Sequence, residues 1–200
     1  QHAEDLRRLK KLAVVLAIQS QVDFQAGRTN EAAASLLDII LLGQTLARGG
    51  VLVDGITGLA VEMIGNASLR SRIPHMDAAT CRQTAHDLEH SESKRESPAQ
   101  IVANEQAWSK ASFGLVSRLG GLLMRKAETR RQAEFTTRSL ETARRTRQLM
   151  LRIGSRAIEL ETGRPVTNAA VLVPAVLSAL PLDPETRIPM TTVPSGEVIP

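Results

Sequence analysis

The chain has 200 residues, a net charge of +4 and a pI of about 9.8. Hydrophobic residues make up 42%, enough for a real core, but aromatic residues make up 2% and Tyr is absent, which argues against a β-sandwich because strands favour aromatic side chains. Its single cysteine, Cys81, excludes an intrachain disulfide. The mildly basic balance permits an anionic partner without requiring one.

Apolar residues recur at three- and four-residue spacing in the first third of the chain, which predicts helices. These span residues 2–26, 30–47 and 51–69. Gly27 suits a left-handed C-cap, and Thr29 or Asn30 suits the next N-cap. The first two helices should form an antiparallel hairpin because the connection is short. The third helix is apolar nearly all round, so it either lies in the core, which we favour, or lines a groove.

Further helices are expected over residues 77–94, 98–118 and 123–161, with Gly120-Gly121 as a turn or a kink. The last of these has a buried face of Leu140, Ala143, Met150, Ile153 and Ala157. A stripe of arginines recurs every seven residues on its exposed side: Arg131, Arg138, Arg145 and Arg152. Glu134 and Glu141 precede Arg138 and Arg145 by four residues, the favourable order for helical ion pairs.

The C-terminal part changes in composition after Gly163, and several prolines follow. A short helix is expected over residues 168–177. Residues 187–193 and Val198-Ile199 are candidates for a short β-hairpin, although prolines limit the pairing. The predicted fold class is all-α, with antiparallel helical hairpins, one long helix and a small Pro-rich C-terminal cap. The predicted division is 1–121 and 122–200, as two parts or as one continuous domain.

Three segments share a layout with a known family: residues 159–165, Leu172-Val173-Pro174, and residues 180–184. They resemble the end of the long helix and the following loop in type II secretion pseudopilins. They look still more like a family of uncharacterised envelope proteins from planctomycete-type bacteria. Phe24 to Arg28, followed by Glu31-Ala32, resembles the turn of a tetratricopeptide-type hairpin.

These resemblances imply a cell-envelope protein on the extracytoplasmic side; the alternative location is the cytoplasm. No stretch of the chain reaches the roughly 18 apolar residues of a membrane span, so membrane association is expected only through a segment outside this chain. Major pseudopilins bind calcium in the C-terminal loop, but here only Asp183, Glu185 and Glu197 offer carboxylates. Calcium takes six to eight oxygen ligands, so no calcium and no other cofactor is predicted.

One motif suggests a metal site. His86-Asp87-Leu88-Glu89-His90 fits the His-x-x-Glu-His pattern of zinc hydrolases, with His86 and His90 one helical turn apart. No third carboxylate ligand is identifiable, and Cys81 points away around the helix. The favoured interpretation is a polar helix with two surface histidines, so neither a metal ligand nor a catalytic residue is predicted. A zinc-dependent hydrolase using His86, Glu89 and His90 is one alternative.

The arginine stripe suggests a second alternative, a basic helical protein that binds nucleic acid. Acidic residues interrupt the stripe at Glu128, Glu134 and Glu141, and aromatic residues for base stacking are missing. The predicted function is therefore a non-enzymatic interaction or scaffold module with a protein partner, an acidic one if it meets the arginines. The contact surface would be the third helix or the arginine stripe.

Overall fold

The computed structural model describes residues 2–193, apart from the side chains of residues 113–126. Its elements are α1 (His2–Gln25), α2 (Thr29–Ala47), α3 (Leu52–Arg70), η1 (Ile73–His75), α4 (Ala78–Ser93), α5 (Pro98–Thr162) and η2 (Ala169–Leu172). The described residues contain no strand, so the predicted all-α class is confirmed. None of the described helices is long and apolar enough to span a membrane.

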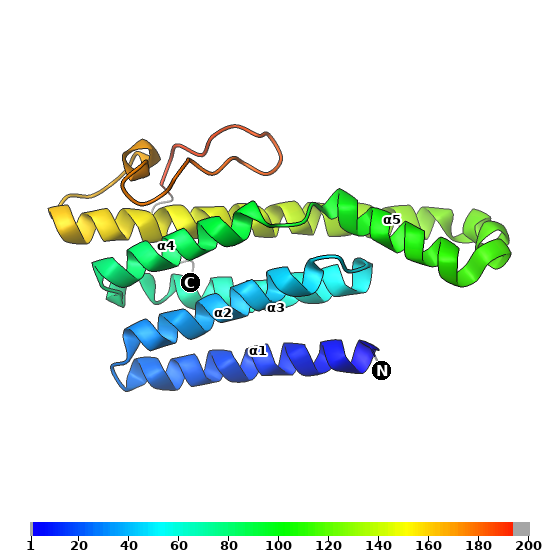
Figure 1. The fold of residues 1–200 in the computed structure, drawn as a ribbon, viewed down its shortest axis with the longest axis horizontal. Coiled ribbons are helices and arrows are strands. Elements are labelled where there is room, and N and C mark those ends of the chain that lie inside the picture. The colour runs from blue at the N-terminus through cyan, green and yellow to red at the C-terminus, as the bar shows by residue number, and fades with distance from the viewer. Residues whose placement is uncertain (1, 194–200) are drawn as a thin grey trace.

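The first three helices run back and forth along the molecule (Figure 1). α1 lies at one edge, α2 and α3 lie between α1 and α5, and α4 lies along α5. The antiparallel hairpin of α1 and α2 is confirmed, and Gly27 turns the chain with a φ of +79°, a conformation that glycine adopts at little cost. The segment after α5 lies against the edge farthest from α1 (Figure 1).

The helix termini follow local chemistry in most places. Asp77 caps α4 by accepting a hydrogen bond from the Thr80 amide at 2.7 Å, and Ser97 caps α5 in the same manner. The N-cap prediction for α2 is wrong, because Arg28 occupies the N-cap and makes no side-chain cap. The Asn30 amide instead donates to the Asp77 carboxylate at 2.8 Å, so it connects two helices.

α5 doubles back on itself. A Cβ placed on Gly55 would lie 2.8 Å from Phe135 and 3.2 Å from Ile101, so both side chains pack on the same spot of α3. A straight helix would separate these two residues by about 50 Å. Figure 1 shows the outgoing arm (98–112) and the returning arm (127–162). The predicted turn at Gly120-Gly121 lies between them, outside the residues described with side chains.

The core consists mainly of aliphatic side chains from all five α-helices and from η2. Its main cluster includes Leu36, Ile40, Leu88, Met150, Ile153 and Leu172. The predicted buried face of the long helix is confirmed at Ala143, Met150, Ile153 and Ala157, whereas Leu140 is half-buried. A smaller cluster joins Leu59, Ile101 and Phe135. The division at 121/122 falls outside the residues described with side chains and stays a prediction.

The C-terminal cap differs from the prediction. The helix expected over 168–177 is only η2, because Val173 precedes a proline and is extended, with φ −105° and ψ 128°. Residues 187–193 do not form a hairpin strand. They make isolated bridges instead, Pro189 with Leu182 and Thr192 with Asn168, since Pro189 has no amide to donate. The expected partner, Val198-Ile199, lies outside the described residues.

Candidate functional site

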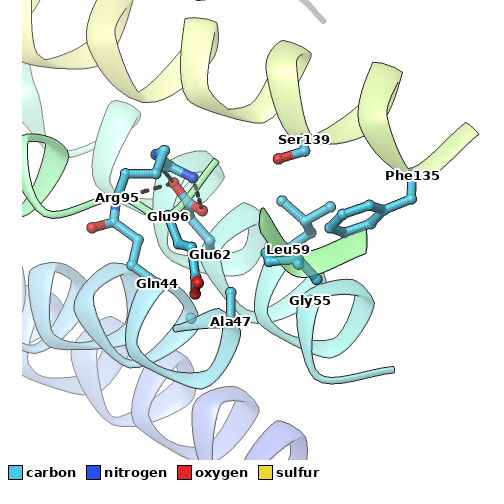
Figure 2. Close-up of a pocket in the computed structure, with 11 residues that line it drawn as sticks. Gln44, Ala47, Gly55, Leu59, Glu62, Arg95, Glu96, Phe135 and Ser139 are labelled. Atoms are coloured by element: carbon cyan, nitrogen blue, oxygen red, sulfur yellow. Dashed lines mark hydrogen bonds and ion pairs between the residues drawn. The ribbon is translucent and has the colours of Figure 1, made fainter. Parts of the chain in front are cut away.

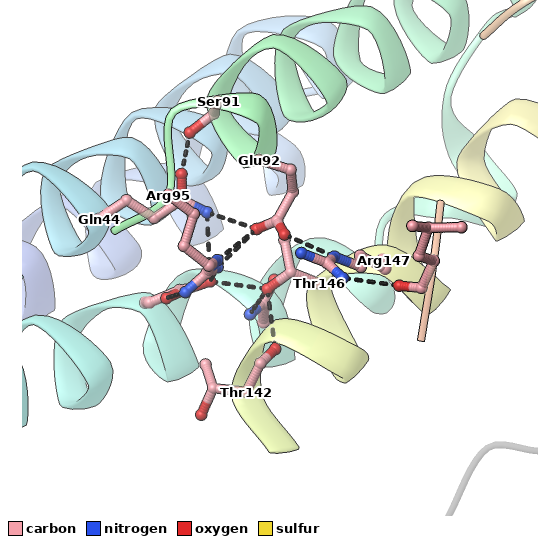
Figure 3. Close-up of polar contacts among 10 residues, drawn as sticks. Gln44, Ser91, Glu92, Arg95, Thr142, Thr146 and Arg147 are labelled. Atoms are coloured by element: carbon pink, nitrogen blue, oxygen red, sulfur yellow. Dashed lines mark hydrogen bonds and ion pairs between the residues drawn. The ribbon is translucent and has the colours of Figure 1, made fainter. Parts of the chain in front are cut away.

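A buried network of charged and polar side chains lies where α2, α3, α4 and the returning arm of α5 meet (Figure 3). Glu62 of α3 is its centre, and its side chain is only 1% exposed. The Glu62 carboxylate accepts hydrogen bonds from Arg95, from Thr146 Oγ1 at 2.7 Å and from Gln44 Nε2 at 3.3 Å. Ser91 in turn donates to Gln44. Each buried polar partner thus limits the cost of burying the others.

The network continues toward the C-terminal cap through Glu92. Its carboxylate accepts from Arg95 Nε at 2.8 Å and from Arg147 Nε at 2.9 Å, and Arg147 also donates to the Leu182 carbonyl at 2.6 Å. Burial by itself lowers the pKa of Arg95, but the ion pairs with Glu62 and Glu92 outweigh burial and raise it. Arg95 is therefore a permanent cation that holds helices together.

A small void lies beside this network, bordered by Glu62, Arg95, Phe135 and Ser139 (Figure 2). Its volume is about 10 Å³, which is at the lower limit for one water molecule. Leu59 and Phe135 close its outer side. The void is too small for an organic ligand, so the network is a structural element.

The roomier cavity lies on the other side of Leu59 and Phe135. It is an open groove of about 220 Å³ between α3 and the returning arm of α5, which we call the α3–α5 groove. Its lining comprises Leu52, Ile56, Leu59, Ala60 and Met63 of α3 and Arg131, Glu134, Phe135, Arg138 and Thr142 of α5. Ile56 is 49% exposed and Met63 47% exposed, so the groove presents apolar surface to solvent.

The structure brings together the two surfaces that the sequence offered as alternatives. Arg131 and Arg138 of the predicted stripe border the groove that α3 lines. Arg145 is also exposed, whereas Arg152 is half-buried and has an interaction partner. The pair of Arg145 with Glu141 is confirmed.

The predicted ion pair between Glu134 and Arg138 is wrong. Glu134 binds Arg130 at 2.9 Å instead. Glu134 lies four residues from each of these arginines, so helical spacing alone permits either partner. Arg138 is consequently left to face the groove.

The His86–His90 motif lies in α4, where Glu89 contacts the C-terminal cap. Both histidines are exposed, and Glu89 accepts hydrogen bonds from Ser178 N at 2.8 Å, Ser178 Oγ at 2.6 Å and Ala179 N at 3.2 Å. Glu89 therefore connects the C-terminal cap to α4 by hydrogen bonds. Burial raises the pKa of the Cys81 thiol to about 12. Within residues 2–193, the described side chains include no metal-binding group of three or more His, Cys, Asp or Glu.

Two of the carboxylates considered as calcium ligands, those of Asp183 and Glu185, bind an arginine. Arg144 donates from Nε to Asp183 at 2.7 Å and from Nη2 to Glu185 at 2.8 Å. Asp183 Oδ1 also accepts from the amides of Glu185 and Thr186, each at 2.9 Å. The hydrogen bond from Arg144, helped by these amides, holds the pKa of Asp183 well below its usual value. The third candidate, Glu197, lies outside the described residues.

The ion pair of Asp183 with Arg144 is expected to make the C-terminal cap sensitive to acid. A carboxyl group whose pKa is lowered on folding contributes fully above its unfolded-state pKa, here 3.8, and loses that contribution as the pH falls through the folded value. We expect hydrogen-exchange protection of the Met190 amide, which donates to the Pro181 carbonyl at 2.9 Å, to fall below pH 3.8. Asp183→Asn should lower this protection at pH 7.

Asp5→Asn is the matched control, because Asp5 only faces Arg8 at 3.8 Å on the exposed surface of α1. Unchanged protection of Met190 in Asp183→Asn would show that the ion pair does not hold the cap.

No protein-family model, curated protein or solved structure matches this chain. The resemblances of residues 159–184 to pseudopilins and of residues 24–32 to tetratricopeptide hairpins therefore stay expectations. The sequence interpretation missed the buried network altogether. One signal for it was present: Glu62 interrupts a nearly apolar helix, and a carboxylate buried with that helix requires a cationic partner.

Proposed function

We propose that this chain is a non-enzymatic interaction module that holds a protein partner in the α3–α5 groove. The observation that carries this proposal is the exposed apolar lining of the groove, 220 Å³ in volume, with Ile56 and Met63 about half exposed. Contiguous apolar surface bordered by polar residues is typical of binding sites for proteins. The groove is open to solvent, as a protein partner requires, and it is bordered by charges that give a partner its orientation.

The proposal includes a location at the cell envelope. Its support is the pseudopilin-like order of residues 159–165, 172–174 and 180–184. The same residues form the cap that Glu89, Arg144 and Arg147 hold against α4 and α5. None of the described cap residues lines the groove, which leaves the groove free for a partner while the cap stabilises the long helix.

The test of this function is to fill the groove. Ala60 lines it and is partly exposed, so Ala60→Trp should occupy the space with an indole ring and leave the core intact. Peptides selected from a displayed random library on the wild-type chain should bind Ala60→Trp at least about tenfold more weakly, the loss expected when an anchor site is blocked. Fluorescence anisotropy with labelled peptides measures the affinities.

The matched control is Ala34→Trp, which adds the same ring at an exposed position of α2. It should leave peptide affinity unchanged. Circular dichroism establishes that both variants fold. Equal affinities for wild type and Ala60→Trp, or a selection that enriches no peptide, would refute the groove as a protein-binding site.

A further inference from the structure

The two walls of the α3–α5 groove differ in chemistry. The α3 wall runs from Leu52 to Met63, and all its lining residues are apolar. The α5 wall runs from Arg131 to Thr142 and carries all the charged residues of the lining. Each wall spans twelve residues, which is about 16 Å or three helical turns. The groove is thus a trough between two helices, with one apolar wall and one charged wall.

The charged side is basic. Arg131 and Arg138 are seven residues apart, so they lie about 10 Å from each other along one face of the helix. Glu134 stands between them, but its carboxylate binds Arg130, which does not line the groove. Among the ion pairs of the described residues, none includes Arg131 or Arg138. The rim therefore offers two cations that a partner can neutralise.

Resting on the proposed function, we infer that the occupant of the α3–α5 groove is an amphipathic helix with acidic residues along one edge of its apolar face. A helix lies in a trough of this length with apolar anchors on successive turns. Its apolar face contacts Ile56 and Met63, and the flexible Met63 side chain adapts to the anchors. Its acidic edge, with carboxylates seven residues apart, faces Arg131 and Arg138.

Charge disfavours a second copy of this chain as the occupant. Another exposed apolar stripe of the described surface is on α1, where Val15, Ile18 and Val22 are 49–60% exposed. Lys11 precedes this stripe by one helical turn, so inserting α1 would bring a like charge to the rim. Shape disfavours a lipid bilayer, because a flat surface does not enter a concave trough.

A displayed library of amphipathic helices tests the inference. The apolar anchors are fixed, and the positions on both edges are randomised among Glu, Gln and Lys. Selection on the wild-type chain should enrich Glu on one edge at seven-residue spacing. A representative Glu peptide should bind about tenfold more tightly than its Gln counterpart, since each exposed ion pair contributes about threefold. The double variant Arg131→Gln, Arg138→Gln should abolish this difference.

Arg145→Gln is the matched control, because Arg145 belongs to the same stripe, pairs with Glu141 and does not line the groove. It should retain the preference for Glu. Equal enrichment of Gln or Lys would overturn the acidic partner. Groove-dependent peptides from the random library that are not helical would overturn this inference and leave the proposed function standing, whereas the absence of groove-dependent peptides would end both.

Two further measurements test whether a membrane or a second copy of the chain occupies the groove instead. Sedimentation of the wild-type chain with phosphatidylglycerol vesicles, lost in Ala60→Trp, would assign the groove to a membrane and overturn the inference. Self-association in light scattering that Ala60→Trp abolishes would assign the groove to a second copy and overturn it equally. A monomer that stays in the supernatant supports the helical partner.

Discussion

Replacing Glu62 by Gln is expected to lower the free energy of unfolding by about 3 kcal/mol, the lower end of the range for breaking a buried ion pair. The Glu62 side chain is 1% exposed and that of Arg95 is 12% exposed, so the variant leaves a buried cation short of one partner. The loss stays at the lower end because Glu92 still binds Arg95 at 2.6 Å. Urea unfolding followed by circular dichroism measures the change.

Glu141→Gln is the control for this prediction. It removes an ion pair with Arg145 in which both side chains are about half exposed, and it should cost less than about 1 kcal/mol. A double-mutant cycle of Glu62→Gln with Arg95→Met should give a coupling energy of about 1–3 kcal/mol, as expected for contacting charges. A loss below about 1 kcal/mol for Glu62→Gln would mean that the network contributes little to stability.

Three of the helix boundaries were predictable because they depend on local chemistry. Gly27, Asp77 and Pro98 act within one turn of the chain, and the helices in the structure begin or end within one or two residues of the expected positions at these points. The cap at Asn30 was predicted wrongly since its amide bonds to Asp77, 47 residues away. The spacing of apolar residues along the chain carries no information about contacts between residues so far apart in the sequence.

The candidate site could be recognised only from the three-dimensional structure. The apolar α3 and the spacing of Arg131 and Arg138 were both visible in the sequence, but as separate surfaces. They meet because α5 doubles back and places Phe135 beside Gly55 and Leu59. The buried network was hidden for the same reason, since Arg95 and Thr146 reach Glu62 from 33 and 84 residues away.

Replacing Gly58 by Ala is expected to destabilise the fold by about 2 kcal/mol. A Cβ on Gly58 would lie 2.4 Å from the Gly43 carbonyl oxygen, and a Cβ on Gly43 would lie 2.6 Å from the Gly58 carbonyl oxygen and from the Glu62 amide. These neighbours are backbone atoms that cannot rotate away, so α2 and α3 must separate. Overpacking against backbone atoms lies at the upper end of the range of about 1–3 kcal/mol, and subtracting the gain of about 1 kcal/mol in helix propensity leaves about 2 kcal/mol.

The variant Gly154→Ala separates the effect of overpacking from the effect of helix propensity. Its Cβ would meet the Val176 side chain at 3.4 Å, an ordinary contact, so the gain in helix propensity remains and stability should rise by up to about 1 kcal/mol. Thermal unfolding of both variants gives the comparison. Opposite signs follow only if the approach of α2 to α3 is limited by Gly43 and Gly58; destabilisation of both variants would point to a general intolerance of α-helical glycine replacement.

The Gly58→Ala substitution should change peptide binding as well as stability. Gly58 directly precedes Leu59, which separates the inner void from the α3–α5 groove. Moving α3 away from α2 pushes Leu59 and Ala60 toward the returning arm of α5 and narrows the groove. Gly58→Ala should therefore weaken groove-dependent peptides under conditions in which the variant is still folded, whereas Gly154→Ala should bind them as the wild type does. Unchanged binding by folded Gly58→Ala would mean that α3 relaxes without altering the groove.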